Sequence, residues 1–145
     1  LKIIKEKTPL GTAGALKLIE KELNSRFFVV LADISFNIDL SEMIVSHLDS
    51  NNIATIAVTT TEKVLSTDTI ILKGNKVRRF VYGAATREKS FLTNAGIYLF
   101  EKVIFKLIPR KGSLELDVFP KLVEKEELNA YIFSEMWRHR RDGRR

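Results

Sequence analysis

The spacing of apolar residues predicts two amphipathic helices in the first third of the chain. Over 12–23, apolar positions recur at helical intervals, and the apolar face consists of Leu16, Ile19 and Leu23. Over 40–48, the same spacing follows Asp39, a preferred helix cap, with Glu42 three residues further on. The apolar stripe of this second helix consists of Leu40, Met43, Ile44, His47 and Leu48. We expect His47 to be a half-buried, hydrogen-bonded side chain and not a ligand.

Runs rich in β-branched and aromatic residues predict strands between and after these helices. The run over 27–32 has no polar side chain and stops at Asp33, so we expect a strand that is central and buried on both faces of a parallel sheet. Residues 69–73 and 76–82 flank Gly74-Asn75, a two-residue hairpin signal. Further strands are predicted over 53–60, 92–100 and 128–133, and helices over 102–108 and 113–124, the latter broken at Pro120.

The order of these elements predicts a three-layer α/β fold with a mixed, mainly parallel sheet. A chain of 145 residues, 45% of them hydrophobic, can bury one core but not two. We divide the chain into one domain over 1–137 and a basic tail over 138–145.

The net charge of +6 is concentrated in this tail, which holds five arginines and one aspartate and so carries +4. A basic tail without aromatic side chains is typical of a solvated, disordered end, and nucleic acid is not the expected partner. A nucleic-acid contact by the tail is the alternative, and its affinity should collapse with salt.

Composition also excludes several classes of protein. The sequence has neither an apolar stretch of 18 residues nor a signal-peptide pattern, so no membrane span is indicated and we expect a cytoplasmic protein. It contains no cysteine, which excludes disulfides, thiolate metal sites and cysteine catalysis. Its two histidines leave almost nothing for a histidine-based triad or zinc site.

Two short segments carry candidate chemistry. Gly11 and Gly14 bracket Thr12 where helical spacing begins, so backbone N–H groups could approach a phosphate or base closely. Asp33 follows a predicted strand, and in open α/β sheets ligands bind beyond the carboxyl ends of strands. Asp33 is therefore placed to hold a divalent cation against phosphate oxygens, in a cleft shared with the glycine segment. The alternative is that the glycines permit a tight turn and that Asp33 begins a loop.

Four segments in fixed order resemble the sugar-phosphate nucleotidylyltransferases, and the resemblance covers almost the whole chain. The segments are PLGTAGAL at 9–16 with Glu6 before it, FFVVLADISFNIDL at 27–40, TNAGIYLFE at 93–101 and LELDVFPKL at 114–122. The resemblance implies a nucleotidyltransferase (Rossmann-like) fold and a reaction in which a sugar 1-phosphate attacks the α-phosphorus of a nucleoside triphosphate.

The same resemblance assigns roles to individual residues. Gly11, Thr12 and Gly14 would bind the nucleotide, Asp33 would be the catalytic Mg²⁺ ligand, and Asn94 and Gly96 would bind the sugar. Positioning and charge neutralisation would lower the barrier without a covalent protein nucleophile.

The chain also departs from the family pattern. Leu31-Ala32 precede Asp33 where the family has Asn-Gly, and His139 stands where the family has a second metal-binding aspartate. The family's N-terminal Gly-rich phosphate loop would lie before Leu1, so we expect an N-terminally truncated domain, either a fragment or a shortened gene product. We therefore expect impaired or no activity from the isolated chain. The alternative is a non-catalytic regulatory or scaffolding relative that binds nucleotide or a partner subunit, and an exposed apolar sheet edge could allow homo-oligomers.

Overall fold

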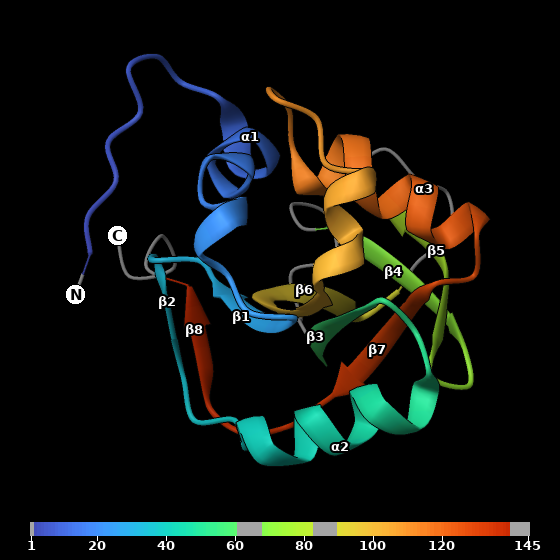
Figure 1. Cartoon of the computed structure of the whole chain (residues 1–145). Helices are drawn as coiled ribbons and strands as arrows, with labels where there is room; N and C mark the ends of the chain where they lie inside the picture. Colours follow the sequence, from blue (N-terminus) through green and yellow to red (C-terminus); the bar gives the residue numbers. More distant parts are fainter. Residues whose placement is uncertain (1, 61–67, 83–89, 140–145) are drawn as a thin grey trace.

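A six-stranded sheet forms the middle layer of the described structure (Figure 1). This computed structural model describes residues 2–60, 68–82 and 90–139. Across the sheet the strands are, in order, β1 (Arg26–Val30), β6 (Leu92–Glu101), β3 (Ala54–Thr60), β7 (Leu128–Ile132), β5 (Lys76–Val81) and β4 (Thr69–Lys73). A separate two-stranded sheet pairs β2 (Ile34–Phe36) with β8 (Trp137–His139).

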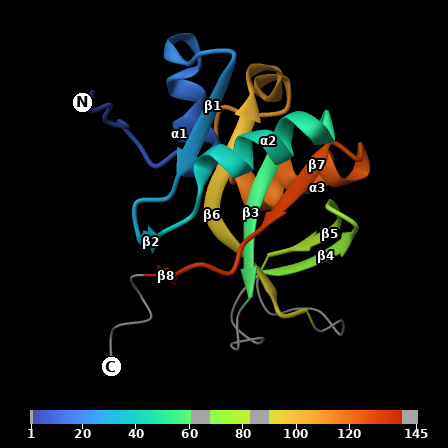
Figure 2. The same ribbon diagram turned by 90° about the horizontal axis from the view of Figure 1, so that it is seen from below.

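Helices cover both faces of the six-stranded sheet (Figures 1 and 2). On one face lies α2 (Leu40–Ser50), where Met43 packs with Ile97 and Leu99 of β6. The other face is covered by α1 (Gly11–Leu18), η2 (Lys102–Lys106), η3 (Leu114–Val118) and α3 (Phe119–Glu124). There Leu16 and Phe119 pack in a larger cluster with alternate residues of the same strands. The predicted three-layer α/β fold is confirmed.

The prediction that the sheet is mainly parallel is wrong. Among the described strands, β3 and β7 form the one parallel pair, whereas β6 is antiparallel to both β1 and β3 and β5 is antiparallel to β4 and β7. The physical reason is the position of β6. Because β6 inserts between β1 and β3, these two strands run in the same direction without pairing with each other.

The apolar strand predicted over 27–32 is shorter than expected, and the prediction that it is central and fully buried is wrong. It corresponds to β1, whose one partner among the described strands is β6, at the edge of the sheet. Phe27 is buried and stacks on Phe105 with ring centroids 5.7 Å apart, but Val30 is 44% exposed. An apolar run shows that a strand has apolar contacts, but its composition does not reveal which neighbours it has.

His47 fastens α2 to the sheet, as the helical stripe predicted. It is buried, its Nδ1 lies 2.7 Å from the Thr55 hydroxyl of β3, and its Nε2 lies 3.1 Å from the Glu101 carboxylate of β6. Glu101 also pairs with Arg26 of β1 at 2.5 Å. Burial lowers the pKa of His47, although the hydrogen bond with Glu101 partly opposes this shift. Partial burial would raise the pKa of Glu101, but hydrogen bonds from Arg26 and His47 lower it overall.

Local signals place several other elements correctly. The Asp39 side chain caps α2 by accepting from the N–H groups of Ser41 at 2.8 Å and Glu42 at 3.3 Å. β4 and β5 form the predicted hairpin around Gly74. The helix predicted over 113–124 divides into η3, a single π-helical segment, and α3, with Pro120 in the first turn of α3.

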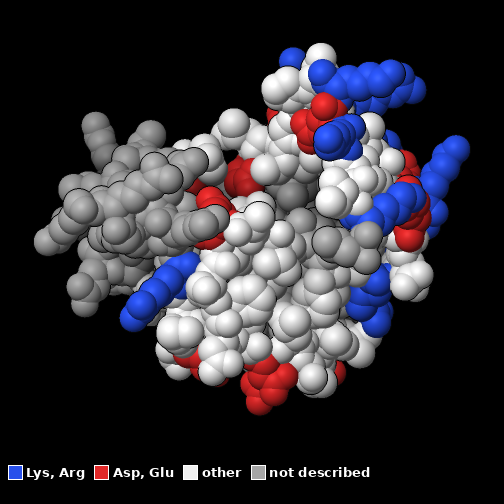
Figure 3. Space-filling view, turned by 90° about the vertical axis from the view of Figure 1, so that its left-hand side faces the viewer, with Lys and Arg blue, Asp and Glu red and all other residues white. Residues whose placement is uncertain are grey.

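The division into a domain over 1–137 and a basic tail over 138–145 stays a prediction. β8 includes Arg138 and His139, which we had assigned to the tail, while residues 140–145 lie outside the described part of the chain. On the face drawn in Figure 3, most lysine and arginine side chains lie along one side, close to acidic ones, and the middle of the face is largely uncharged. None of the helices in the described ranges is long and apolar enough to cross a membrane.

Candidate active site

The start of α1 packs against the loop that precedes η3. Gly11 has a φ of +77°, and a Cβ there would collide with the carbonyl oxygen of Gly112. At Gly14 a Cβ would lie 2.7 Å from the carbonyl oxygen of Arg110, and the Ala13 N–H donates to Gly112 at 3.0 Å. Both glycines thus allow two backbone segments to touch, which is the structural alternative to a ligand site. Nucleotide binding by this segment stays a prediction.

A chain of hydrogen bonds joins Thr12, at the start of α1, to Asn94 on β6. The Thr12 hydroxyl donates to Glu115 Oε2 at 3.0 Å and accepts from the Leu114 N–H at 2.8 Å. The other carboxylate oxygen of Glu115 accepts from the Tyr98 hydroxyl at 3.3 Å, and this hydroxyl accepts from Asn94 Nδ2 at 2.9 Å. The structure therefore brings together one residue predicted to bind nucleotide and one predicted to bind sugar, through two side chains that the sequence analysis did not single out.

Both connecting side chains are buried, Tyr98 with no exposed surface and Glu115 with 7% exposed. Burial, together with the charge of Glu115, raises the pKa of Tyr98 well above its usual range, so its hydroxyl stays a donor. Glu115 also accepts from the Ser113 hydroxyl at 2.6 Å. One signal was available in the sequence, since Glu115 is a carboxylate between two leucines, but the same pattern fits an exposed helical position.

Gly96 lies in a bulge of β6, where the register with β3 shifts. Its φ is +75°, and its N–H donates to the side-chain oxygen of Asn94 at 3.0 Å, which orients that amide. Its carbonyl accepts from the Leu31 N–H at 2.9 Å, and a Cβ at Gly96 would lie 3.0 Å from a methyl carbon of Leu31. Asn94 and Gly96 are thus held against the segment that leads from β1 to Asp33.

Asp33 lies in the turn between β1 and β2, partly buried. β2 pairs with β8 so that Ile34 lies opposite His139. The Trp137 indole N–H donates to the Ala95 carbonyl at 2.9 Å, which fixes β8 to the bulge of β6. The backbone positions of Asp33 and His139 are consequently near neighbours, as expected if both belong to one site. β2 and β8 were not predicted, because three-residue strands carry too little pattern.

The residues present can be tested against a magnesium ion. The described part of the chain contains no group of three or more histidine, cysteine, aspartate or glutamate side chains that could hold a metal by themselves. Mg²⁺ bound with a nucleotide, however, usually takes one or two carboxylates from the protein and its other ligands from phosphate and water. A single carboxylate at Asp33 fits that arrangement, and Mg²⁺ binding there stays a prediction.

The chain is an α/β layered domain whose polar side chains gather where β1 ends and β6 begins, next to the glycine-containing start of α1. This is the place where α/β proteins bind their ligands. The sequence model of the family described as Nucleotidyl transferase matches residues 1–139. The chain belongs to this family, and the resemblance found in the sequence is confirmed.

Curated relatives and solved structures agree with this assignment. The chain is 33% identical over 142 residues to mannose-1-phosphate guanyltransferase 2 of Candida glabrata, and 33% identical over 138 residues to mannose-1-phosphate guanyltransferase of Yarrowia lipolytica. The match covers 91% of this chain but 38% of each relative. The crystal structure of HddC from Yersinia pseudotuberculosis complexed with GMP-PN superposes with a TM-score of 0.77 at 27% identity, covering 94% of this chain and 59% of that one.

Proposed function

We propose that this chain forms part of a sugar-1-phosphate nucleotidylyltransferase that transfers a guanylyl group to mannose 1-phosphate. In this reaction a phosphate oxygen of the sugar attacks the α-phosphorus of GTP, the bond to the β-phosphate breaks, and pyrophosphate leaves. The choice of base and sugar rests on the named activity of the curated relatives, of which the chain spans 38%. A cytoplasmic location and Mg²⁺ as the metal are further parts of the proposal.

The observation that carries the proposal is the hydrogen-bond chain from Thr12 through Glu115 and Tyr98 to Asn94. A nucleotidyl transfer requires two substrates to be held in fixed relative positions, because orientation supplies much of the rate. These hydrogen bonds connect the start of α1, predicted to bind nucleotide, with β6, predicted to bind sugar. They run through buried groups, which have little freedom to move.

Individual residues receive the following roles. Thr12 contacts the guanine nucleotide beside the glycine segment, and Asn94, oriented by Gly96, contacts sugar hydroxyls. Asp33 would hold Mg²⁺ together with phosphate oxygens, and the metal would neutralise phosphate charge when bound. Glu115 positions both Thr12 and Tyr98 through its two carboxylate oxygens.

Binding of GDP-mannose to the 145-residue chain tests the proposal. Isothermal titration calorimetry should show that Thr12→Val and Asn94→Ala each weaken binding about three- to tenfold. The matched controls Thr8→Val and Asn24→Ala, at exposed positions, should leave affinity unchanged. Equal affinity for GDP-mannose and GDP would contradict the sugar assignment, and unchanged affinity in Thr12→Val would contradict the nucleotide assignment.

A non-catalytic relative is the second candidate. It is favoured by Leu31-Ala32 before Asp33 and by His139 at a position where the family resemblance implies a carboxylate, because histidine is a poor ligand for a hard cation. Pyrophosphate release from GTP and mannose 1-phosphate distinguishes the two. Turnover that disappears in Asp33→Asn would show that these changes are harmless, whereas binding without turnover would support the second candidate.

A further inference from the structure

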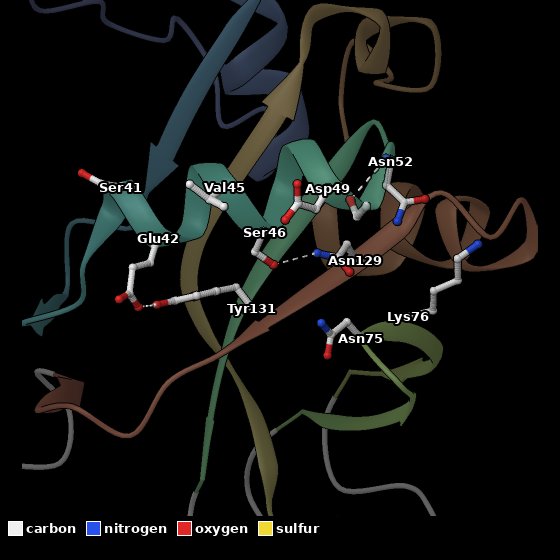
Figure 4. Close-up of a pocket in the computed structure, with 11 residues that line it drawn as sticks. Ser41, Glu42, Val45, Ser46, Asp49, Asn52, Asn75, Lys76, Asn129 and Tyr131 are labelled. Atoms are coloured by element: carbon white, nitrogen blue, oxygen red, sulfur yellow. Dashed lines mark hydrogen bonds between the residues drawn. The ribbon is translucent and has the colours of Figure 1, made fainter.

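A cavity lies on the α2 side of the sheet, away from the hydrogen bonds that join Thr12 to Asn94. It has a volume of about 720 Å³ and is bounded by α2, by β7 and by the turn between β4 and β5 (Figure 4). This volume is in the range of small-molecule sites. Its walls are fixed to one another, since Asn129 Nδ2 donates to the Ser46 hydroxyl at 3.4 Å and the Ala130 N–H donates to the Asn75 carbonyl at 2.7 Å.

One buried side chain in this cavity lacks a hydrogen-bond partner. Asn52 is 8% exposed, and its Nδ2 is the one buried side-chain nitrogen or oxygen in the described residues that has no partner. Its side chain projects from the end of α2 into the space beside Asn75 and Lys76 (Figure 4). A buried amide donor without an acceptor costs about 1–3 kcal/mol, so Asn52 needs an acceptor that the protein does not provide, and a ligand in the cavity can supply one.

The other lining residues restrict what that ligand can be. Glu42 and Asp49 face the cavity against a single cation, Lys76, which disfavours an anion such as a phosphate or a nucleotide. A simple cation offers no acceptor for Asn52. The lining combines polar side-chain groups with carbon surface, which includes Val45 and the Tyr131 ring, and this combination suits a ligand that presents both hydroxyl and C–H groups.

We infer that this cavity binds an uncharged, polyhydroxylated ligand of the size of a mono- or disaccharide. Hydroxyl groups both donate and accept, so one such molecule can donate to Asp49 and accept from Asn52 and Lys76. The Tyr131 ring and Val45 offer apolar contact to the C–H groups of a sugar ring. The Tyr131 hydroxyl is already committed to Glu42, to which it donates at 2.9 Å. This site is separate from the proposed reaction site and does not depend on it.

Titration of the ¹⁵N-labelled chain with unphosphorylated mannose, glucose and maltose, followed by NMR, tests the inference. At sugar concentrations up to about 50 mM, which reveal millimolar affinities, the side-chain amide of Asn52 and the backbone amides of Asp49 and Lys76 should shift. The side-chain amide of Asn94 should not shift with them. Mannose 1-phosphate should bind the cavity more weakly than mannose, because of the two carboxylates.

Variants make the assignment specific. Asn52→Leu should weaken sugar binding about three- to tenfold, and so should Asp49→Ala, which changes an exposed side chain and leaves the core intact. The control Asn24→Ala, at an exposed position outside the cavity, should have no effect. The inference is overturned if none of the sugars shifts the cavity resonances, if the shifts are confined to Asn94 and Thr12, or if neither cavity variant changes the affinity.

Discussion

Replacing Tyr98 by phenylalanine removes one hydroxyl group from the centre of the hydrogen-bond chain and leaves the buried ring in place. Two hydrogen bonds are lost, one from Asn94 at 2.9 Å and a longer one to Glu115 at 3.3 Å. Tyr98 has no exposed surface, so water cannot replace the missing group. At about 1 kcal/mol for each bond, and more for groups left unpaired, we expect a loss of about 1–3 kcal/mol in the free energy of unfolding.

Thermal and urea unfolding measure this loss, which for a chain of this size corresponds to a decrease in Tm of roughly 3–9 °C. Tyr131→Phe is the matched control, because Tyr131 also donates to a glutamate, Glu42, but in an exposed contact. We expect Tyr131→Phe to change stability by less than about 0.5 kcal/mol. If the two variants lose the same stability, or if Tyr98→Phe is more stable than the parent, the network does not hold the two segments together.

Three further outcomes follow from other parts of the structure. Gly11→Ala should lower the free energy of unfolding, measured in urea, by more than about 2 kcal/mol, because position 11 has a positive φ and touches Gly112. Gly74→Ala is the control: its φ is also positive but nothing lies within 4 Å of the added Cβ, so it should cost about 1 kcal/mol. Equal losses in the two variants would argue against the contact with Gly112. Because burial lowers the pKa of His47, the folded state binds its proton less readily than the unfolded state, so the free energy of unfolding should fall as pH decreases below about 6.5. His47→Gln should make the free energy of unfolding depend less on pH in this range, as measured by unfolding curves at a series of pH values. An equally steep dependence in the variant would show that His47 is not its cause. His139→Asp should increase the Mg²⁺-dependent part of the GTP affinity measured by calorimetry, and an unchanged Mg²⁺ dependence would place position 139 outside the metal site.

Local chemistry was sufficient to predict elements whose determinants lie within a few residues. Asp39 as the cap of α2 and the turn at Gly74 each depend on neighbours in the sequence. Helical spacing likewise placed His47 on the buried face of α2, although its partners Thr55 and Glu101 come from distant strands. The three-layer fold followed from the order of such elements, because helices on both faces of a sheet are the common way to bury its apolar side chains.

Features that depend on distant pairing were not available from the pattern. The apolar composition of β1 is the same for an edge strand as for a central one, and its position was decided by β6, about 70 residues later in the sequence. The link from Thr12 to Glu115 spans 103 residues, and a sequence without aligned relatives gives no sign of that proximity. The candidate residues were therefore identified one by one, while the groups that connect them required the fold.

The insertion of β6 between β1 and β3 also constrains how the chain can fold during synthesis. Within these residues β1 and β3 precede β6 in the sequence, and among the described strands neither has a neighbour in the sheet until residues 92–101 have been made, while β3 gains its second neighbour only with β7 at Leu128–Ile132. Pairing at such sequence separation is slow, and strands with open edges are prone to pair with other chains. Until β6 has been made, the edges of β1 and β3 that it covers stay open to pairing with other strands.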